Sequence, residues 1–137
     1  MSMADFNTQV ITEFRDNAGR VGGMFESMPL LLLHHVGAKS GANRVAPLAY
    51  FEDDGRYAIF ASKAGAPENP AWYHNLLANP DTTIEVGGET IEVTATEAEG
   101  EERDRIFAAQ AARVPQFGDY QEKTARTIPV VLLTPKG

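Results

Sequence analysis

The stretch TTIEVGGETIEVTAT, residues 82–96, decides the fold, because two runs of alternating apolar and polar residues flank the dipeptide Gly87-Gly88. Two glycines between such runs are typical of a tight hairpin turn with positive φ angles. This turn pairs Ile84 with Ile91 and places the apolar side chains of both runs on one face. The hairpin predicts an antiparallel sheet rather than a strand–helix–strand unit.

Further apolar runs extend this pattern along the chain. Residues 30–36, 44–51 and 57–62 are predicted strands separated by the turns 37–41 and 52–55, and residues 128–133 form a last, wholly apolar strand. The short connections predict consecutive antiparallel strands. Six such strands predict a small β-barrel with peripheral helices.

Four segments beside the strands are predicted to be helical. In residues 5–18, Phe6, Val10 and Phe14 recur at a spacing of four, which is typical of an amphipathic helix. The others are a short helix after Pro70, a helix with an acidic first turn and a short polar segment, over residues 71–78, 100–113 and 119–126. The predicted fold class is therefore mainly β with peripheral helices (α+β), in a single domain over residues 1–137.

Composition and charge exclude several classes of function. The 137 residues carry a net charge of −7, which argues against nucleic-acid binding because that function needs a basic surface. There is no cysteine, so disulfides and thiolate-bound metal clusters are excluded. No apolar run reaches the roughly 20 residues of a membrane-spanning helix, and residues 1–5 show no signal-peptide features. We therefore expect a cytoplasmic protein.

Positive charge is concentrated in one glycine-rich stretch. Residues 27–51 contain two bases, Lys39 and Arg44, and no acid, whereas residues 81–104 contain nine acids and one base. This contrast suggests a small anionic ligand, and the alternative is a chance distribution over a solvated acidic face.

The turn GAKSGANR, residues 37–44, is the candidate anion site. Its glycines can free backbone amides to face an anion, and Ser40 offers a hydroxyl beside the two bases. It is not a Walker motif, because the spacing of glycine and lysine differs and no helix follows. Lys63, at the end of the third predicted strand, joins the site if the two loops converge. The alternative is a plain hairpin turn with a surface arginine.

The three histidines do not predict a metal site. His34 and His35 are adjacent on a strand and so point to opposite faces, while His74 lies in a predicted helix without a carboxylate at a ligand spacing. The chain also has no G-x-S-x-G elbow. We therefore expect neither a metal ion nor a serine nucleophile.

The segment PAWYHNL, residues 70–76, gathers aromatic and polar side chains in one short helix. Trp72 and Leu76 share a face, which is typical of core packing, and the alternative for Trp72 is a platform for a ligand. Asn75, near the end of this helix, can bond a neighbouring turn.

Four motifs follow one another along the chain. They are G-x-K-S-G-x-x-R-x-x-P-L (37–48), A-S-K-x-G (61–65), N-P-x-W-Y-H-N-L (69–76) and D-Y-Q-x-K-T-x-R-x-I-P-V (119–130). In order and spacing they resemble the deazaflavin (coenzyme F420)-dependent nitroreductase and quinone reductase family, over essentially the whole chain. The resemblance implies a split β-barrel like that of FMN-binding proteins, and such enzymes are typical of actinobacteria.

The resemblance also implies an activity and a set of site residues. These enzymes transfer a hydride from reduced F420 to an electron-poor quinone, enone or nitro compound. By position, the binders of the cofactor phosphate and acidic tail are matched by Lys39, Ser40, Arg44 and Lys63. Positions that line or support the deazaflavin site are matched by Pro47, Leu48, Ala61, Ser62, Gly65, Trp72 and Asn75. Tyr120 matches a tyrosine at the acceptor pocket, whose hydroxyl can stabilise charge that develops on the acceptor.

Some positions depart from the family pattern, and three alternatives remain. His34 and His35 replace small hydroxyl residues, and Val114 and Phe117 replace tyrosines, which points away from bulky nitroimidazoles. The alternatives are an FMN-binding reductase of the same fold, a non-catalytic deazaflavin carrier and a structural interaction module. The expected partner is a small-molecule acceptor; acids in the N-terminal helix disfavour an anionic membrane surface, and the oligomeric state stays open.

Overall fold

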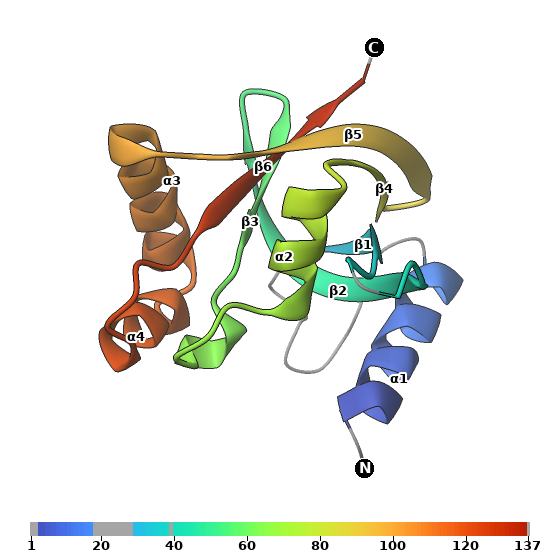
Figure 1. Ribbon diagram of the computed structural model, residues 1–137, viewed down its shortest axis with the longest axis horizontal. Coiled ribbons are helices and arrows are strands. Elements are labelled where there is room, and N and C mark those ends of the chain that lie inside the picture. The colour runs from blue at the N-terminus through green and yellow to red at the C-terminus, as the bar shows by residue number, and fades with distance from the viewer. Residues whose placement is uncertain (1–2, 18–28, 39, 137) are drawn as a thin grey trace.

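In the computed structural model, which describes residues 3–17, 29–38 and 40–136, six strands form a closed antiparallel barrel (Figure 1). The strands are β1 Leu30–Val36, β2 Asn43–Asp53, β3 Arg56–Phe60, β4 Asp81–Val86, β5 Glu89–Glu97 and β6 Val130–Pro135. The helical elements are α1 Met3–Asp16, the 3-10 turn η2 Lys63–Gly65, α2 Ala71–Ala78, α3 Gly100–Arg113 and α4 Gln116–Lys123. The predicted fold class, a mainly β barrel with peripheral helices, is confirmed.

The strand order around the barrel is β1-β2-β3-β6-β5-β4. The predicted meander of β1, β2 and β3 is confirmed, and so is the β4–β5 hairpin, in which Ile84 pairs with Ile91. A short pairing of β1 with β4, through Leu33 and Ile84, closes the barrel. The predicted central position of the last strand is also confirmed, since β6 lies between β3 and β5.

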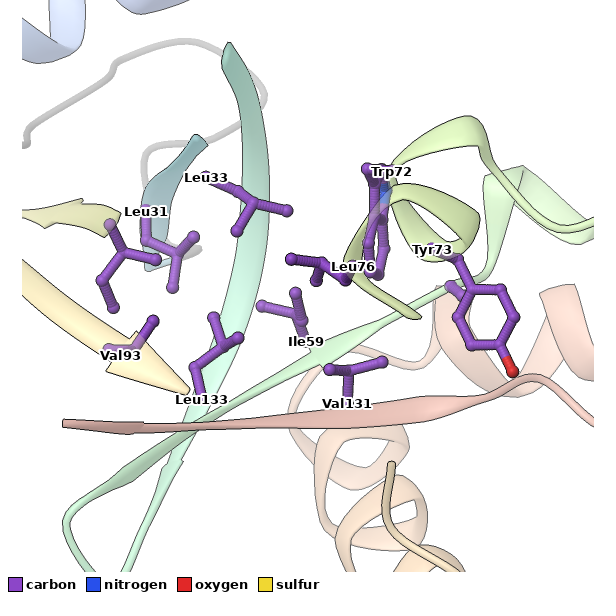
Figure 2. Packing of buried hydrophobic residues seen from close by; sticks show 11 residues of the cluster. Leu31, Leu33, Ile59, Trp72, Tyr73, Leu76, Val93, Val131 and Leu133 are labelled. Atoms are coloured by element: carbon purple, nitrogen blue, oxygen red, sulfur yellow. The ribbon is translucent and has the colours of Figure 1, made fainter. Parts of the chain in front are cut away.

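The barrel interior is filled by side chains that alternate along each strand, as the period of two requires. Figure 2 shows these residues converging from the strands, with α2 placed across them. Ile59 and Leu133 are wholly buried there, and Leu76 from α2 is 1% exposed. The short helix α2 therefore belongs to the core and cannot move without opening it.

Two further apolar clusters lie on the outside of the barrel. The outward side chains of β3 and β6 pack under α3 and α4, where Phe60 contacts Phe107 and Phe117 edge to face. The outward side chains of β1 pack under α1, which contributes Val10 and Phe14, as the spacing of four predicts. The helices thus cover two separate parts of the barrel wall. No described helix is long and apolar enough to cross a membrane.

Some elements end where the sequence does not predict. A helix is predicted over residues 119–126, but α4 begins at Gln116 because Pro115 already has helical backbone angles. It ends at Lys123 because Thr124 is extended, with φ −125° and ψ 145°. Similarly, β3 ends at Phe60 instead of residue 62, because the chain there turns into η2.

The bounds of the last strand and of the N-terminal helix also differ from the predicted ones. Strand β6 begins at Val130 rather than residue 128, because the amide of Ile128 donates to the side chain of Gln121 instead of a neighbouring strand. Helix α1 ends at Asp16 rather than residue 18.

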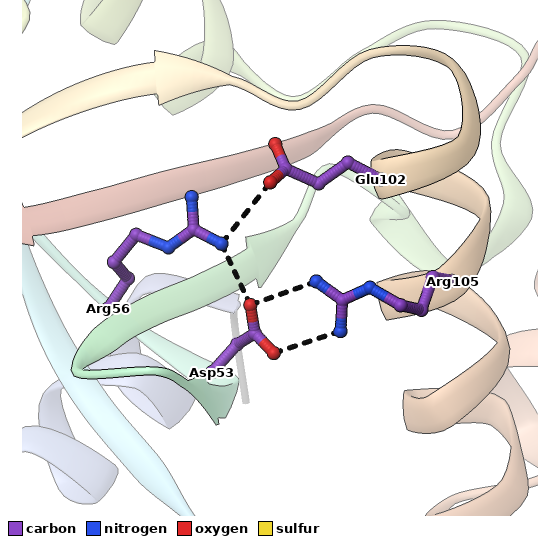
Figure 3. Close-up of polar contacts among 4 residues, drawn as sticks. All are labelled: Asp53, Arg56, Glu102 and Arg105. Carbon is purple, nitrogen blue, oxygen red and sulfur yellow. Dashed lines mark hydrogen bonds and ion pairs between the residues drawn. The ribbon is translucent and has the colours of Figure 1, made fainter.

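An ion-pair network joins the β2–β3 turn to α3 (Figure 3). The carboxylate of Asp53 accepts from Arg105 at 3.0 and 3.1 Å and from Arg56 at 2.8 Å. Arg56 also reaches Glu102 at 3.3 Å. The hydrogen bonds from Arg105 and then Arg56 lower the pKa of Asp53 from 3.8 to about 2. The network therefore holds α3 to the turn most strongly while Asp53 is ionised.

Candidate functional site

The β1–β2 turn, the predicted anion site, is closed by its own hydrogen bonds. The amide of Gly37 donates to Ala42 O at 2.9 Å, and that of Gly41 donates to Gly37 O at 2.9 Å. The amide of Ala42 donates to the hydroxyl of Ser40 at 3.2 Å. The prediction that the glycines free amides to face an anion is therefore wrong for these groups, because the turn uses them to hold its own shape.

Asn75 on α2 holds the β1–β2 turn and the end of β1 through two hydrogen bonds. Its side-chain oxygen accepts from the amide of Ala38 at 2.9 Å, and its side-chain nitrogen lies 2.9 Å from Nδ1 of His35. Asn75 and His35 are both buried, at 7% exposure each. Burial, and then the neighbouring Arg44 and His34, lower the pKa of His35. Because the side-chain oxygen of Asn75 accepts from Ala38, its nitrogen is the donor to Nδ1 of His35. As expected for Asn75, it bonds a neighbouring turn.

His34 and His35 point to opposite faces of β1, as the strand period predicts. Nε2 of His34 lies 2.7 Å from Glu85 on β4, whose carboxylate also accepts two hydrogen bonds from Arg15 of α1. His34 thus belongs to the contact between α1 and the barrel, and His35 to the contact between β1 and α2. Among the described residues, no group of three or more His, Asp or Glu side chains is placed to hold a metal ion.

The side chains predicted to bind an anion differ in whether they already form an ion pair. Arg44 lies at the exposed start of β2. It forms no ion pair within the described part of the chain. Lys63 is exposed and paired with Glu68 at 2.8 Å. Such an exposed pair contributes little, so Lys63 can exchange Glu68 for another anion. Lys39, the other predicted base of the turn, lies outside the described residues.

The second loop follows β3 and contains Ser62, Lys63 and Gly65. Lys63 has φ +45°, a left-handed conformation that is unusual for a residue other than glycine. Gly65 has φ +81°, and a Cβ there would lie 2.9 Å from both Lys123 Cβ and Tyr120 O. The loop therefore packs directly on the backbone of α4, and Lys123 is a further cation beside it that sequence reasoning did not single out.

Three residues expected at the deazaflavin site belong to the barrel core. Leu48, Ala61 and Trp72 all contribute to the interior cluster, and Trp72 is 7% exposed. Pro47, by the alternation of β2, lies on the opposite face of the strand and is half-buried. The placement of Trp72 agrees with the core-packing interpretation. Because all four residues are buried or half-buried, they fit the expected role of supporting the deazaflavin site better than that of lining it.

Tyr120 lies on α4, next to the second loop. Its ring contacts Phe117 edge to face and packs, half-buried, on the cluster under α3 and α4. Its main chain is the part that approaches Gly65. The structure gives its hydroxyl no hydrogen-bond partner among the described residues.

Two cavities are lined by residues other than those predicted for the site. One, of about 240 Å³, lies between α2, β5 and β6 and is lined by Leu76, Leu77, Pro80, Ala95, Thr96, Glu97 and Val131. At its edge Tyr73 donates to Glu97 at 2.6 Å; burial and this acid raise the pKa of Tyr73 to about 12. The other, of about 110 Å³, lies beside Arg15 and the β4–β5 turn.

The structure thus joins two cationic loops through one helix. The β1–β2 turn contacts α2 at Asn75, and the second loop leads through Asn69 into the same helix. Arg44 therefore follows a turn that α2 contacts, and Lys63 lies in the loop that leads into α2. A family of proteins described as F420H(2)-dependent quinone reductases has a sequence model that matches residues 7–135. The chain belongs to this family.

Relatives and solved structures agree with the family. A putative F420H(2)-dependent quinone reductase of Mycobacterium tuberculosis is 42% identical over 118 residues, covering 85% of this chain and 99% of the relative. A solved F420H2-dependent reductase, FDR-A, is 42% identical with a TM-score of 0.70, over 77% of this chain and 93% of that one. A putative pyridoxamine 5′-phosphate oxidase of Listeria innocua is 13% identical with a TM-score of 0.58, over 79% and 84%, and shares the fold alone. As a member of the F420H(2)-dependent quinone reductase family, this protein is an oxidoreductase with a split β-barrel fold.

Arg126 is the main residue of this region that sequence reasoning missed. It lies within the last of the four motifs, but the segment it contacts is about sixty residues earlier in the chain. A contact of this kind leaves no periodicity or local spacing in the sequence. The one available signal is an arginine placed between a helix end and a buried strand.

Proposed function

We propose that this protein catalyses hydride transfer from reduced coenzyme F420 to a quinone. Membership of the F420H(2)-dependent quinone reductase family supports the cofactor and the acceptor class. The structural observation that carries the proposal is the exposed Arg44, free of ion pairs in the described residues, at the start of β2 and directly after a turn held by Asn75. The protein as a whole carries a net charge of −7, so an exposed and unpaired arginine is a local positive site that an anionic cofactor can reach.

The residues present fit an elongated anionic cofactor. Lys39, Ser40, Arg44 and Lys63 bind its phosphate and acidic tail in this proposal, by charge and by the hydroxyl. The deazaflavin site is lined or supported by Pro47, Leu48, Ala61, Ser62, Gly65, Trp72 and Asn75. Because the amides of Gly37, Ala38, Gly41 and Ala42 already have partners, the affinity in this proposal comes mainly from side chains.

When bound, reduced F420 supplies the hydride, and the protein supplies position and a proton. Transfer of a hydride to a quinone leaves the hydroquinone anion, and a hydroxyl donor or water stabilises and protonates its oxygen to give the hydroquinone. In our proposal Tyr120 is that donor, because its hydroxyl has no partner within the described fold and its ring is fixed against Phe117. The same chemistry applies to enones and nitro compounds, which we propose as further acceptors.

The test is multiple-turnover oxidation of reduced F420 by menadione under anaerobic conditions, followed by the return of F420 absorbance. We expect many equivalents of F420 to be formed for each equivalent of protein. Oxidation that stops at one equivalent indicates the carrier alternative, and yellow purified protein that turns over with NADPH but not with reduced F420 indicates the FMN alternative. Either result would overturn the proposal. Parallel assays with an enone and a nitroarene rank the acceptors.

A further inference from the structure

The guanidinium of Arg126 is surrounded by acceptors from the second loop. Its Nε donates to Ala66 O at 3.0 Å, Nη1 to Ala61 O at 3.1 Å and Nη2 to Ser62 O at 3.0 Å. Nη1 also donates to the side-chain oxygen of Asn69 at 2.6 Å. Three main-chain carbonyls and one amide side chain, all between residues 61 and 69, therefore converge on one half-buried side chain.

The segment that Arg126 holds has an unfavourable backbone conformation. Lys63 is left-handed at φ +45°, and Gly65 at φ +81° touches α4. Two main-chain hydrogen bonds close the turn in the described structure: Gly65 donates to Ser62 O at 2.9 Å and Ala66 to Lys63 O at 3.0 Å. A left-handed lysine persists only when its surroundings impose the conformation. The fork of Arg126 binds carbonyls on both sides of Lys63 and so restrains the chain before and after it.

Arg126 is itself fixed from α3 and α4. Its carbonyl accepts from Gln121 Nε2 at 2.7 Å, and Gln121 Oε1 accepts from Arg103 at 2.8 Å and from the amide of Ile128 at 3.0 Å. Helix α4 packs on η2 in Figure 1, so the loop and the helix that carries Tyr120 meet at this point. The chain from Gln121 through Arg126 therefore connects the proposed cofactor loop to the proposed acceptor side.

We propose that Arg126 is a positioning residue for the cofactor: its guanidinium holds residues 61–69 in the conformation that presents Ser62 and Lys63 to bound F420. This inference rests on the proposed function, which it deepens. Arg126 does so through geometry, because a planar fork reaches four acceptors and an ammonium group cannot reach them in the same arrangement. Replacing it by lysine keeps the charge and removes the fork.

The experiment compares Arg126→Lys with Arg56→Lys, the same change at an arginine that binds Asp53 and Glu102 and shares no partner with Arg126. Hydrogen exchange of the peptide covering residues 61–69, without cofactor, should be faster in Arg126→Lys, because Gly65 and Ala66 lose their protected turn. The Kd for F420, read by fluorescence, should rise about tenfold, and the KM for reduced F420 with it. The kcat at saturating cofactor should stay within about twofold of wild type. Arg56→Lys should leave the exchange and the Kd unchanged.

If Arg126→Lys does not fold, Asn69→Ala removes one of the four acceptors and should speed the exchange while raising the Kd about threefold. Wild-type exchange and wild-type Kd in the folded variants would overturn this inference alone. A wild-type protein that does not bind F420 would overturn the proposed function and this inference with it, so the two failures are distinguishable.

Discussion

Replacing Asn75 by leucine tests whether α2 fixes the β1–β2 turn. The substitution keeps the branching and the number of heavy atoms of the side chain, with bulkier methyl groups in place of the amide, and it removes both hydrogen bonds, one to the amide of Ala38 and one to Nδ1 of His35. The amide of Ala38 is on an exposed residue, so water can replace its partner. His35 is buried at 7% exposure, so its ring nitrogen stays without one.

The magnitude follows from these two environments. Each lost hydrogen bond costs about 0.5–1.5 kcal/mol, and leaving a buried acceptor unpaired adds about 1–3 kcal/mol. Because water replaces one bond, we expect Asn75→Leu to lower the free energy of unfolding by about 2–4 kcal/mol in total. For a domain of this length the Tm should fall by about 6–15 °C. The turn also loses its anchor, so the Kd for F420 should rise.

The assay is urea unfolding followed by tryptophan fluorescence, since Trp72 lies on the same helix. The matched control is Asn79→Leu, the same chemical change at an exposed residue at the end of α2. We expect the control to stay within about 0.5 kcal/mol of wild type. Equal stability of the two variants would show that Asn75 does not hold the turn, and the account of how α2 positions it would be wrong.

Three further predictions concern the barrel and α4. The pKa of Asp53 is about 2 in the fold against 3.8 in the reference state, so the stabilisation from this carboxylate is complete above about pH 4 and is lost as the pH falls toward 2. The free energies of unfolding of wild type and Asp53→Asn should differ by about 1–2 kcal/mol at neutral pH, a figure reduced for solvent screening on the exposed side of the network, and should converge at low pH. Unfolding measured along an acid titration of both proteins checks this. Gly65→Ala must place a Cβ against the backbone of α4, whereas Gly41→Ala, also at positive φ, meets nothing within 4 Å; urea unfolding should show Gly65→Ala less stable than Gly41→Ala by about 1–3 kcal/mol, and equal values would contradict the close packing. Tyr120→Phe should leave stability and F420 affinity unchanged but lower turnover on a quinone and an enone by about tenfold; wild-type turnover would return Tyr120 to a packing role.

The sequence predicts those features that depend on local pattern. The β4–β5 hairpin follows from Gly87-Gly88 and the alternation around it, and β1 and α2 follow from their composition and flanking prolines and glycines. Each of these signals lies within about fifteen residues of what it determines. The order of the strands and the closure of β1 on β4 depend on packing of the whole barrel, which no local pattern contains.

The candidate site was less predictable than the fold, for a physical reason. The glycines of the β1–β2 turn suggest free amides, but the turn closes on itself and consumes them. The end of α4 depends on Thr124, whose extended backbone frees Arg126 to reach a loop far away in the chain. Glycine and arginine both predict an anion site from sequence, yet in the structure they also serve the internal hydrogen bonding of the loops.

The most direct test of the account is a fluorescence titration of F420, FMN and NADPH against the wild-type protein and Arg44→Ala, with Arg113→Ala as a control that removes an exposed arginine from the end of α3. We expect wild type to bind F420 more tightly than FMN or NADPH, and Arg44→Ala to lose about 1.5–3 kcal/mol of F420 binding, which is roughly 10-fold to 150-fold in Kd. Added salt should weaken the wild-type affinity, because the contact is exposed, and Arg113→Ala should bind as wild type does. Submicromolar binding of FMN or NADPH with no binding of F420 would contradict the central claim.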